Sequence, residues 1–112
     1  MKHLMLRGLV VGPVSTNCYF LKNKDTDEIL IADPGAEPDR IIRTVEQLSG
    51  HPAGILLTHG HYDHIGSVNE VAAHFGCKIV GAAKEMPVFT DPALNCSQFV
   101  GGPIIVHPDI LV

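Results

Sequence analysis

The sequence predicts an α/β fold (α+β in some schemes), with a mixed β-sheet and helices against one face. The first reason is the order of segments: three short apolar runs come first, and later apolar runs alternate with helix-like segments. The second is composition, because 46% hydrophobic and 18% charged residues are typical of a globular chain. The third is length, since 112 residues suffice for one small domain.

The first three strands are expected at residues 3–11, 17–22 and 28–32, which are short runs rich in apolar residues. Gly12-Pro13 separates the first two, so these are expected to run antiparallel. Asp33-Pro34-Gly35 ends the third strand abruptly.

A helix is expected to begin at Pro38, where the missing N–H costs nothing. Gly50 is expected to cap its C-terminus. A short buried strand should follow at residues 55–57 and lead directly into Thr58. The apolar residues of the helix recur at helical spacing and form one face: Ile41, Ile42, Val45 and Leu48.

A second helix is expected after Ser67, because residues 67–70 have the Ser-x-x-Glu form of a capping box, and it should end at Gly76. Further strands are expected at residues 77–80 and 104–106. Residues 84–89 should form a short helical turn, and residues 90–103 should be irregular.

Charge and composition exclude several classes of protein. The formal net charge is −4 and no Lys/Arg cluster is present, so nucleic acid is not expected as a partner. No apolar run approaches the ~20 residues that span a bilayer, and no cleavage site follows the apolar N-terminus, so neither membrane span nor signal peptide is expected. Three scattered cysteines indicate reduced thiols in a cytoplasmic protein.

The segment that carries chemistry runs from Thr58 to Gly66. In an extended chain the residues at positions 59 and 61 project to the same side, and the residue at 63 continues that alternation. The glycines at 60 and 66 are expected to give freedom for a tight turn. Imidazole nitrogen and carboxylate oxygen suit Zn²⁺ and also tolerate Fe or Mn. The candidate metal ligands are three imidazoles and one carboxylate: His59, His61, Asp63 and His64.

This segment matches the His-x-His-x-Asp-His signature of the metallo-β-lactamase superfamily, and the resemblance extends beyond it. Asn17-Cys18-Tyr19 and Asp33-Pro34-Gly35 precede the signature in the superfamily's order. The Asn95-x-Ser97 region is similar to the glyoxalase II-like branch. The resemblance implies that residues 1–112 form the N-terminal half of a four-layer αββα sandwich, with the C-terminal half absent.

By the same resemblance, His59 and His61 would bind a first zinc ion, and Asp63 and His64 a second. Asp63 would also help to aim the attacking hydroxide. Asp33 would be an acidic group that orients the ligands or the metal-bound water. His61 favours the hydrolytic branch, because oxygen-reducing diiron relatives tend to carry Glu there.

The resemblance implies a hydrolase in which a metal-bound hydroxide attacks a small-molecule thioester such as an S-acylglutathione. One alternative is a persulfide dioxygenase-like enzyme with a single iron ion. Another is a non-catalytic half-domain that binds metal and assembles into a homo-oligomer. The remaining ligands of the family, carried by motifs such as Pro-Gly-His-Thr, do not occur here. The chain alone is therefore expected to be inactive unless a second copy or the missing half completes the site.

Overall fold

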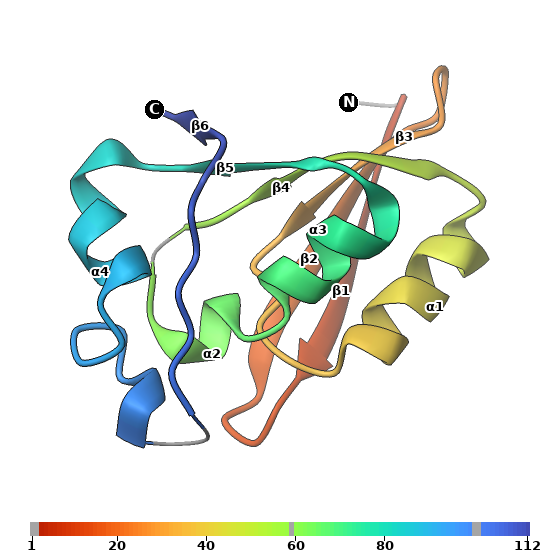
Figure 1. Ribbon diagram of the computed structural model, residues 1–112. Coiled ribbons are helices and arrows are strands. Elements are labelled where there is room, and N and C mark those ends of the chain that lie inside the picture. Colours follow the sequence, from red (N-terminus) through yellow and green to blue (C-terminus); the bar gives the residue numbers. More distant parts are fainter. Residues whose placement is uncertain (1–2, 59, 100–101) are drawn as a thin grey trace.

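The computed structural model describes residues 3–58, 60–99 and 102–112 and contains one six-stranded sheet (Figure 1). The spatial order of the strands follows their order in the chain. The first three form an antiparallel meander, and each later strand lies parallel to the one before it. The strands are β1 (Leu4–Val11), β2 (Thr16–Asn23), β3 (Glu28–Ala32), β4 (His51–Leu56), β5 (Lys78–Gly81) and β6 (Ile110–Leu111).

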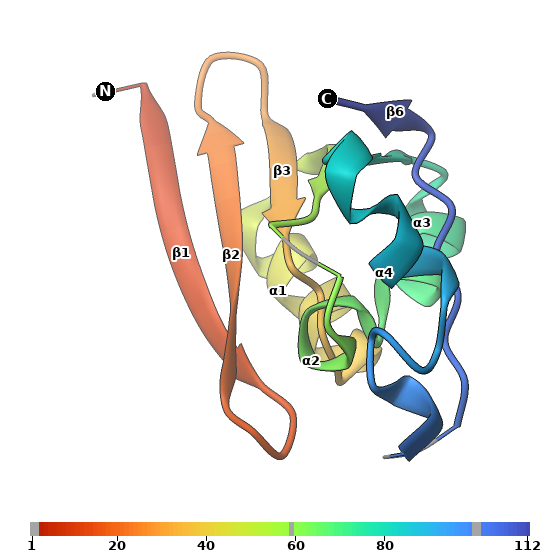
Figure 2. The ribbon, with the colours of Figure 1, turned by 90° about the vertical axis from the view of Figure 1, so that its left-hand side faces the viewer.

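Helices cross over between the parallel strands, as parallel pairing requires. Figure 2 shows that they lie on the same side of β1 and β2, which confirms the predicted mixed sheet with helices on one face. None of the helices in the described part of the chain is long and apolar enough to cross a membrane. The helices are α1 (Pro38–Leu48), α2 (Tyr62–Ile65), α3 (Val68–Phe75) and α4 (Met86–Thr90), with 3₁₀ turns η1 (Ala83–Glu85) and η2 (Ser97–Phe99).

The core lies between the sheet and these helices. Alternate residues of β2 and β3 point toward the helices because successive side chains of a strand face opposite sides of the sheet. Ile41, Val45 and Leu48 of the predicted apolar stripe of α1 meet them, whereas Ile42 is only partly buried and Thr44 is buried in addition. The fully buried members of this core include Cys18, Phe20, Ile29, Ile31, Ile41, Ile55, Val68 and Val71.

The other face of the sheet is apolar, and no helix of the described residues packs on it. Leu6 pairs with Leu21, and Tyr19 pairs with Ala32, so these side chains share one face. Leu6 is 67% exposed, whereas the core residues beneath it are fully buried. We call this surface the open face; its residues are Leu6, Tyr19, Leu21, Leu30, Ala32 and Leu56.

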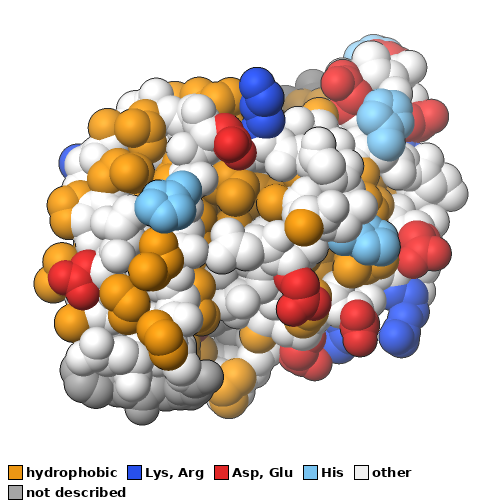
Figure 3. Space-filling model, viewed as in Figure 1, with side chains coloured by type: hydrophobic (Ala, Val, Ile, Leu, Met, Phe, Trp, Pro, Cys, Tyr) orange, Lys and Arg blue, Asp and Glu red, His pale blue; other side chains and the backbone are white. Residues whose placement is uncertain are grey.

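Figure 3 shows the opposite, helix-bearing side of the molecule. Hydrophobic side chains gather over α4 and the C-terminal segment, and acidic side chains gather at the lower right. The exposed large apolar residues after α4 are Leu94, Ile105, Ile110, Leu111 and Val112.

The end of α1 differs from the sequence expectation. Ser49, not Gly50, takes the left-handed capping conformation, with φ 56°, and donates its N–H to Glu46 O. Gly50 is needed for close packing, because a Cβ there would lie 2.5 Å from the carbonyl oxygen of Asp27. The prediction of a glycine cap was therefore wrong by one residue.

The capping box expected at α3 does not form. Ser67 makes no side-chain capping bond, and its backbone φ and ψ of −112° and 7° lie outside the extended range of a usual N-cap. Its N–H instead donates to Pro34 O at 2.9 Å. The loop after β3 therefore holds the start of this helix, while Gly76 ends it in the left-handed conformation as predicted.

Residues 104–106 are not a strand. Side chains bind this segment: Ser97 Oγ accepts the N–H of Ile104 at 2.7 Å, and Asn95 Nδ2 donates to Ile104 O at 2.9 Å. The N–H of Val106 donates to the carbonyl oxygen of Phe89, which lies within α4, rather than to a sheet edge. The edge of β5 is occupied instead by β6.

Candidate metal centre

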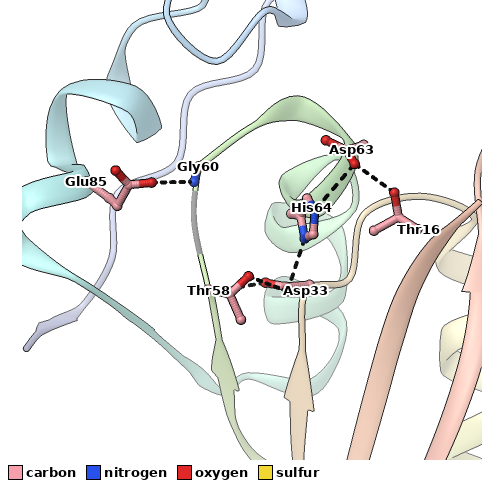
Figure 4. A network of polar contacts seen from close by, with 7 residues as sticks. All are labelled: Thr16, Asp33, Thr58, Gly60, Asp63, His64 and Glu85. Carbon is pink, nitrogen blue, oxygen red and sulfur yellow. Dashed lines mark hydrogen bonds and ion pairs between the residues drawn. The ribbon is translucent and has the colours of Figure 1, made fainter. Parts of the chain in front are cut away.

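The candidate site begins where β3 and β4 end side by side. Because these strands are parallel, their carboxyl ends meet at one edge of the sheet. Asp33 Oδ1 accepts the N–H of Thr58 at 2.8 Å, and Asp33 Oδ2 accepts the Thr58 hydroxyl at 2.6 Å (Figure 4). The Asp33 N–H donates to Leu56 O at 3.0 Å. Asp33 is thus tied to the strand that leads into the signature segment.

The backbone of Asp33 is strained. Its φ is 53°, in the left-handed region that Asp and Asn tolerate better than most side chains. The residue is only 5% exposed. Non-glycine residues in such conformations persist where the surroundings hold them, and they cluster at functional sites.

His64 lies between two carboxylates. Its Nδ1 is 3.1 Å from Asp33 Oδ2, and its Nε2 is 3.3 Å from Asp63 Oδ2. The hydroxyl of Thr16 donates to the same Asp63 oxygen at 2.8 Å. Three side chains predicted from the sequence thus lie in a continuous series of polar contacts, from Asp33 through His64 to Asp63 (Figure 4). Sequence reasoning did not single out Thr16, although it directly precedes the Asn17-Cys18-Tyr19 motif.

Gly35 and Gly66 bring these groups together, and for Gly66 the reason differs from the tight turn that was expected. A Cβ on Gly35 would collide with the carbonyl oxygen of Asp63, and a Cβ on Gly66 would collide with the carbonyl oxygen of Gly35. Gly66 has an ordinary helical φ of −57°, so turn flexibility is not what it supplies. The loop after β3 and helix α2 are in direct backbone contact, which sets the position of Asp33 beside His64.

The signature segment is not extended throughout. His61 has extended φ and ψ of −65° and 148°, but α2 begins at the next residue, so Asp63 lies on a helical turn rather than continuing the alternation. The turn also allows the side chains of Asp63 and His64 to face one another. His59 lies outside the described residues.

Two potential metal-ligand atoms, Asp63 Oδ2 and His64 Nε2, lie at a separation that fits a shared metal ion. Two ligand atoms bound at 2.0–2.2 Å to a tetrahedral zinc ion are about 3.3–3.6 Å apart, and these two atoms are 3.3 Å apart. Within residues 3–58, 60–99 and 102–112, however, no three His, Cys, Asp or Glu side chains form a metal-binding group. The full ligand set of His59, His61, Asp63 and His64 thus stays a prediction.

Two hollows adjoin this site. One of about 320 Å³ lies over Thr16, Asp33, Asp63 and His64. A second of about 480 Å³ is also lined by Thr16 and Asp63, and in part by Ser67. Both have the size of small-molecule sites.

Cys18 lies near Asp33 but is unsuited to metal binding as a thiolate. Burial, and secondarily the negative charge of Asp33, raises the pKa of its thiol from 9.0 to about 12. Its thiol therefore stays protonated at neutral pH.

Asn95 is a structural residue. It is fully buried, its side chain donates to Ile104 O, and its Oδ1 accepts the N–H of Ser97 at 2.9 Å. Its carbonyl oxygen accepts the N–H of Tyr62 at 2.8 Å, which links the Asn95-x-Ser97 region to the signature segment.

Comparison with known proteins places these features in a family context. A family model described as the metallo-β-lactamase superfamily matches residues 11–112. The probable metallo-hydrolase YqgX of Bacillus subtilis is 36% identical over 96 residues, which are 86% of this chain and 44% of that protein. Hydroxyacylglutathione hydrolase GloC of Haemophilus influenzae is 38% identical over 66 residues, 59% of this chain and 31% of that one.

Solved structures agree with this assignment. The B3 metallo-β-lactamase BLEG-1 has a TM-score of 0.87 and 38% identity, covering 96% of this chain and 53% of its own. A di-iron form of TTHA1623 has a TM-score of 0.74 at 24% identity, covering 95% of this chain and 52% of its own, and supports the fold alone. The chain spans about half the length of these relatives.

Proposed function

Because this chain belongs to the metallo-β-lactamase superfamily, we propose that it carries half of a metal-dependent thioester hydrolase site. The observation that carries this proposal is the connected series from Asp33 through His64 to Asp63. Buried carboxylates that hold an imidazole in one orientation are a common support for metal-binding histidines.

Each residue has a distinct role in this proposal. His59 and His61 would hold one zinc ion, and Asp63 and His64 the other. When bound, such ions make a water molecule acidic enough to act as the nucleophile and polarise the substrate carbonyl. Asp33 Oδ2 lies 3.1 Å from His64 Nδ1, so in this proposal it would accept the Nδ1 proton and leave the Nε2 lone pair free for the ion.

Thr16 restrains the other ligand of this pair. Its hydroxyl donates to the Asp63 oxygen that also faces His64, so the carboxylate has a fixed orientation before any ion binds. Preorganised ligands of this kind lower the cost of assembling a site. Asp63 can then contribute both to holding the second ion and to orienting the attacking water.

A thioester is the substrate class that the relatives favour. GloC, whose name gives hydroxyacylglutathione hydrolysis, is among the similar proteins. The hollow over Thr16, Asp33, Asp63 and His64 is large enough for the acyl end of such a molecule. We propose a cytoplasmic enzyme, in line with the free thiols of Cys18, Cys77 and Cys96.

We further propose that the open face is covered in the active form. Large contiguous apolar surfaces on soluble proteins usually mark contact sites. The relatives are about twice as long as this chain, so a second half is the first choice of cover, and a second copy is the other. The second half would also bring the ligands that this chain lacks.

The test joins this chain to the C-terminal half of YqgX and measures bound zinc and hydrolysis of S-lactoylglutathione. We expect two zinc ions per fused chain and thioester turnover, with weak zinc binding and little turnover for the 112-residue chain alone. His64→Ala should abolish turnover, while the matched control His74→Ala, at an exposed position on α3, should retain it.

Three results would contradict the proposal. One is a folded fusion that binds no zinc. Another is a zinc-loaded fusion that is inactive on thioesters, lactones and phosphodiesters alike. The third is a fusion with one iron ion that consumes oxygen with a persulfide, which would favour the dioxygenase alternative.

A further inference from the structure

A side chain from a separate segment holds the peptide between the predicted ligands His59 and His61. Glu85, in η1, accepts the backbone N–H of Gly60 on Oε1 at 3.2 Å, although the two residues are 25 positions apart in the sequence. Figure 4 shows Glu85 approaching the signature loop from the side opposite Asp33.

Packing restrains the same loop from the same side. A Cβ on Gly60 would lie 2.8 Å from Phe89 Cδ1 and 2.9 Å from Val88 Cγ1, so the Gly60 backbone rests directly against α4. Phe89 is fully buried and cannot easily move aside. Two residues beyond Gly60, the N–H of Tyr62 donates to Asn95 O. The segment around α4 thus holds the loop at two backbone positions.

We propose that Glu85 is a positioning residue for the metal centre, acting through the Gly60 peptide on the flanking histidines. This inference rests on the proposed function, because it assumes that those histidines bind metal. The observed hydrogen bond of Glu85 is to the backbone of Gly60, so its proposed action is on the backbone. A loop whose peptide is already oriented loses less conformational freedom when its side chains take up an ion.

The relevant property of Glu85 is its oxygen acceptor, not its charge. Gln at this position keeps a carbonyl oxygen of the same reach and removes the negative charge, whereas Ala removes both. Glu37 offers a matched control. It also accepts a glycine N–H, that of Gly12 at 2.8 Å, but at the turn between β1 and β2.

The first measurement is zinc affinity by competition with a chromophoric chelator, using the fused protein described above. We expect Glu85→Ala to weaken zinc binding about tenfold, within the usual range for groups that orient ligands. Glu85→Gln should stay within about threefold of the parent, and Glu37→Ala within about twofold. Cobalt substitution gives a second readout, since a displaced histidine changes the ligand-field spectrum of Glu85→Ala alone.

The second measurement needs no metal. In the metal-free protein, NMR should show the Gly60 amide protected from hydrogen exchange, with protection lost in Glu85→Ala and largely retained in Glu85→Gln. If the parent protein bound no zinc, the proposed function would fail, yet this measurement would still decide whether Glu85 holds the loop.

Several outcomes would overturn the inference. If the Gly60 amide of the parent exchanged rapidly, or if its protection did not change in Glu85→Ala, the proposed contact would be absent in solution. If the zinc affinity of Glu85→Ala equalled that of the parent, the contact would have no effect on metal binding. A Glu85→Gln variant as weak as Glu85→Ala would mean that charge is what matters. An equal loss in Glu37→Ala would mean that general destabilisation is responsible.

Discussion

Replacing Asp33 by Asn should leave the fold in place and change which nitrogen of His64 carries the proton. The Asn oxygen can still accept the N–H of Thr58, now at 2.8 Å from Asp33 Oδ1. The Asn NH₂ would stand where Oδ2 now lies 3.1 Å from His64 Nδ1, and it can only donate. His64 Nδ1 must then accept, so the ring proton moves to Nε2 and blocks the nitrogen proposed to bind the ion.

The magnitudes separate this effect from simple destabilisation. In Asp33→Asn the bond from the Thr58 N–H changes from charge-assisted to neutral, and the Thr58 hydroxyl loses its acceptor at the Oδ2 position. At about 1 kcal/mol for each of these two changes, the substitution should cost about 2 kcal/mol of unfolding free energy. Asp33→Ala removes both acceptors of Thr58 and adds left-handed strain, for about 2–5 kcal/mol in total. Loss of the orienting carboxylate should weaken zinc binding by about 10–100-fold in both variants.

Three assays check this reasoning on the same protein. Urea denaturation gives the unfolding free energies, long-range ¹H–¹⁵N NMR gives the tautomer of His64, and chelator competition gives zinc affinity. A folded Asp33→Asn protein in which His64 keeps its Nδ1 proton would refute the argument. So would an Nε2-protonated His64 with unchanged zinc affinity.

Further variants probe the packing and titration described above. Gly35→Ala should destabilise the chain by ~1–3 kcal/mol or more through its clash with α2, whereas Gly54→Ala, where a new Cβ meets nothing closer than 3.6 Å, should be mild in urea denaturation. Since burial raises the pKa of Cys18 from 9.0 to about 12, the unfolded state loses this proton first as pH rises, and stability should fall between pH 9.0 and about 12. The Cys18→Ala protein should lack that component, about 1.4 kcal/mol per pH unit, in urea melts across this window. Asn95→Asp replaces a buried donor with an acceptor and should lower the unfolding free energy by about 1–3 kcal/mol, measured in the same way, and an unchanged melt would contradict its structural role.

Local patterns were sufficient to predict most of the secondary structure. The apolar runs of β1, β2, β3 and β5 and the apolar stripe of α1 identify these elements because each buries one side in the core. The strand expected at residues 55–57 covers only the end of β4, which begins at His51. The wrong strand at residues 104–106 shows the limit of this approach. An apolar run cannot reveal that its polar partners will be Asn95 and Ser97 rather than a neighbouring strand.

The residues of the candidate site likewise fall into those that the sequence could predict and those that it could not. Asp33 and the signature residues could be recognised because they belong to continuous motifs. Thr16 and Glu85 could not, because their contacts join residues 47 and 25 positions apart and depend on how the sheet and the helices meet. The prediction of a capping box at Ser67 failed for a related reason. The conformation of Ser67 depends on the loop after β3, where Pro34 O accepts its N–H.

The long spans of these contacts bear on the order of events during folding. Thr16 reaches Asp63 across 47 residues, and Asp33 reaches Thr58 across 25, so the site exists only after the meander and the first parallel crossover have both closed. Such nonlocal closure is slow compared with helix formation. Zinc supplied early in refolding would therefore meet dispersed ligands, and its uptake should follow the recovery of tertiary structure rather than nucleate it.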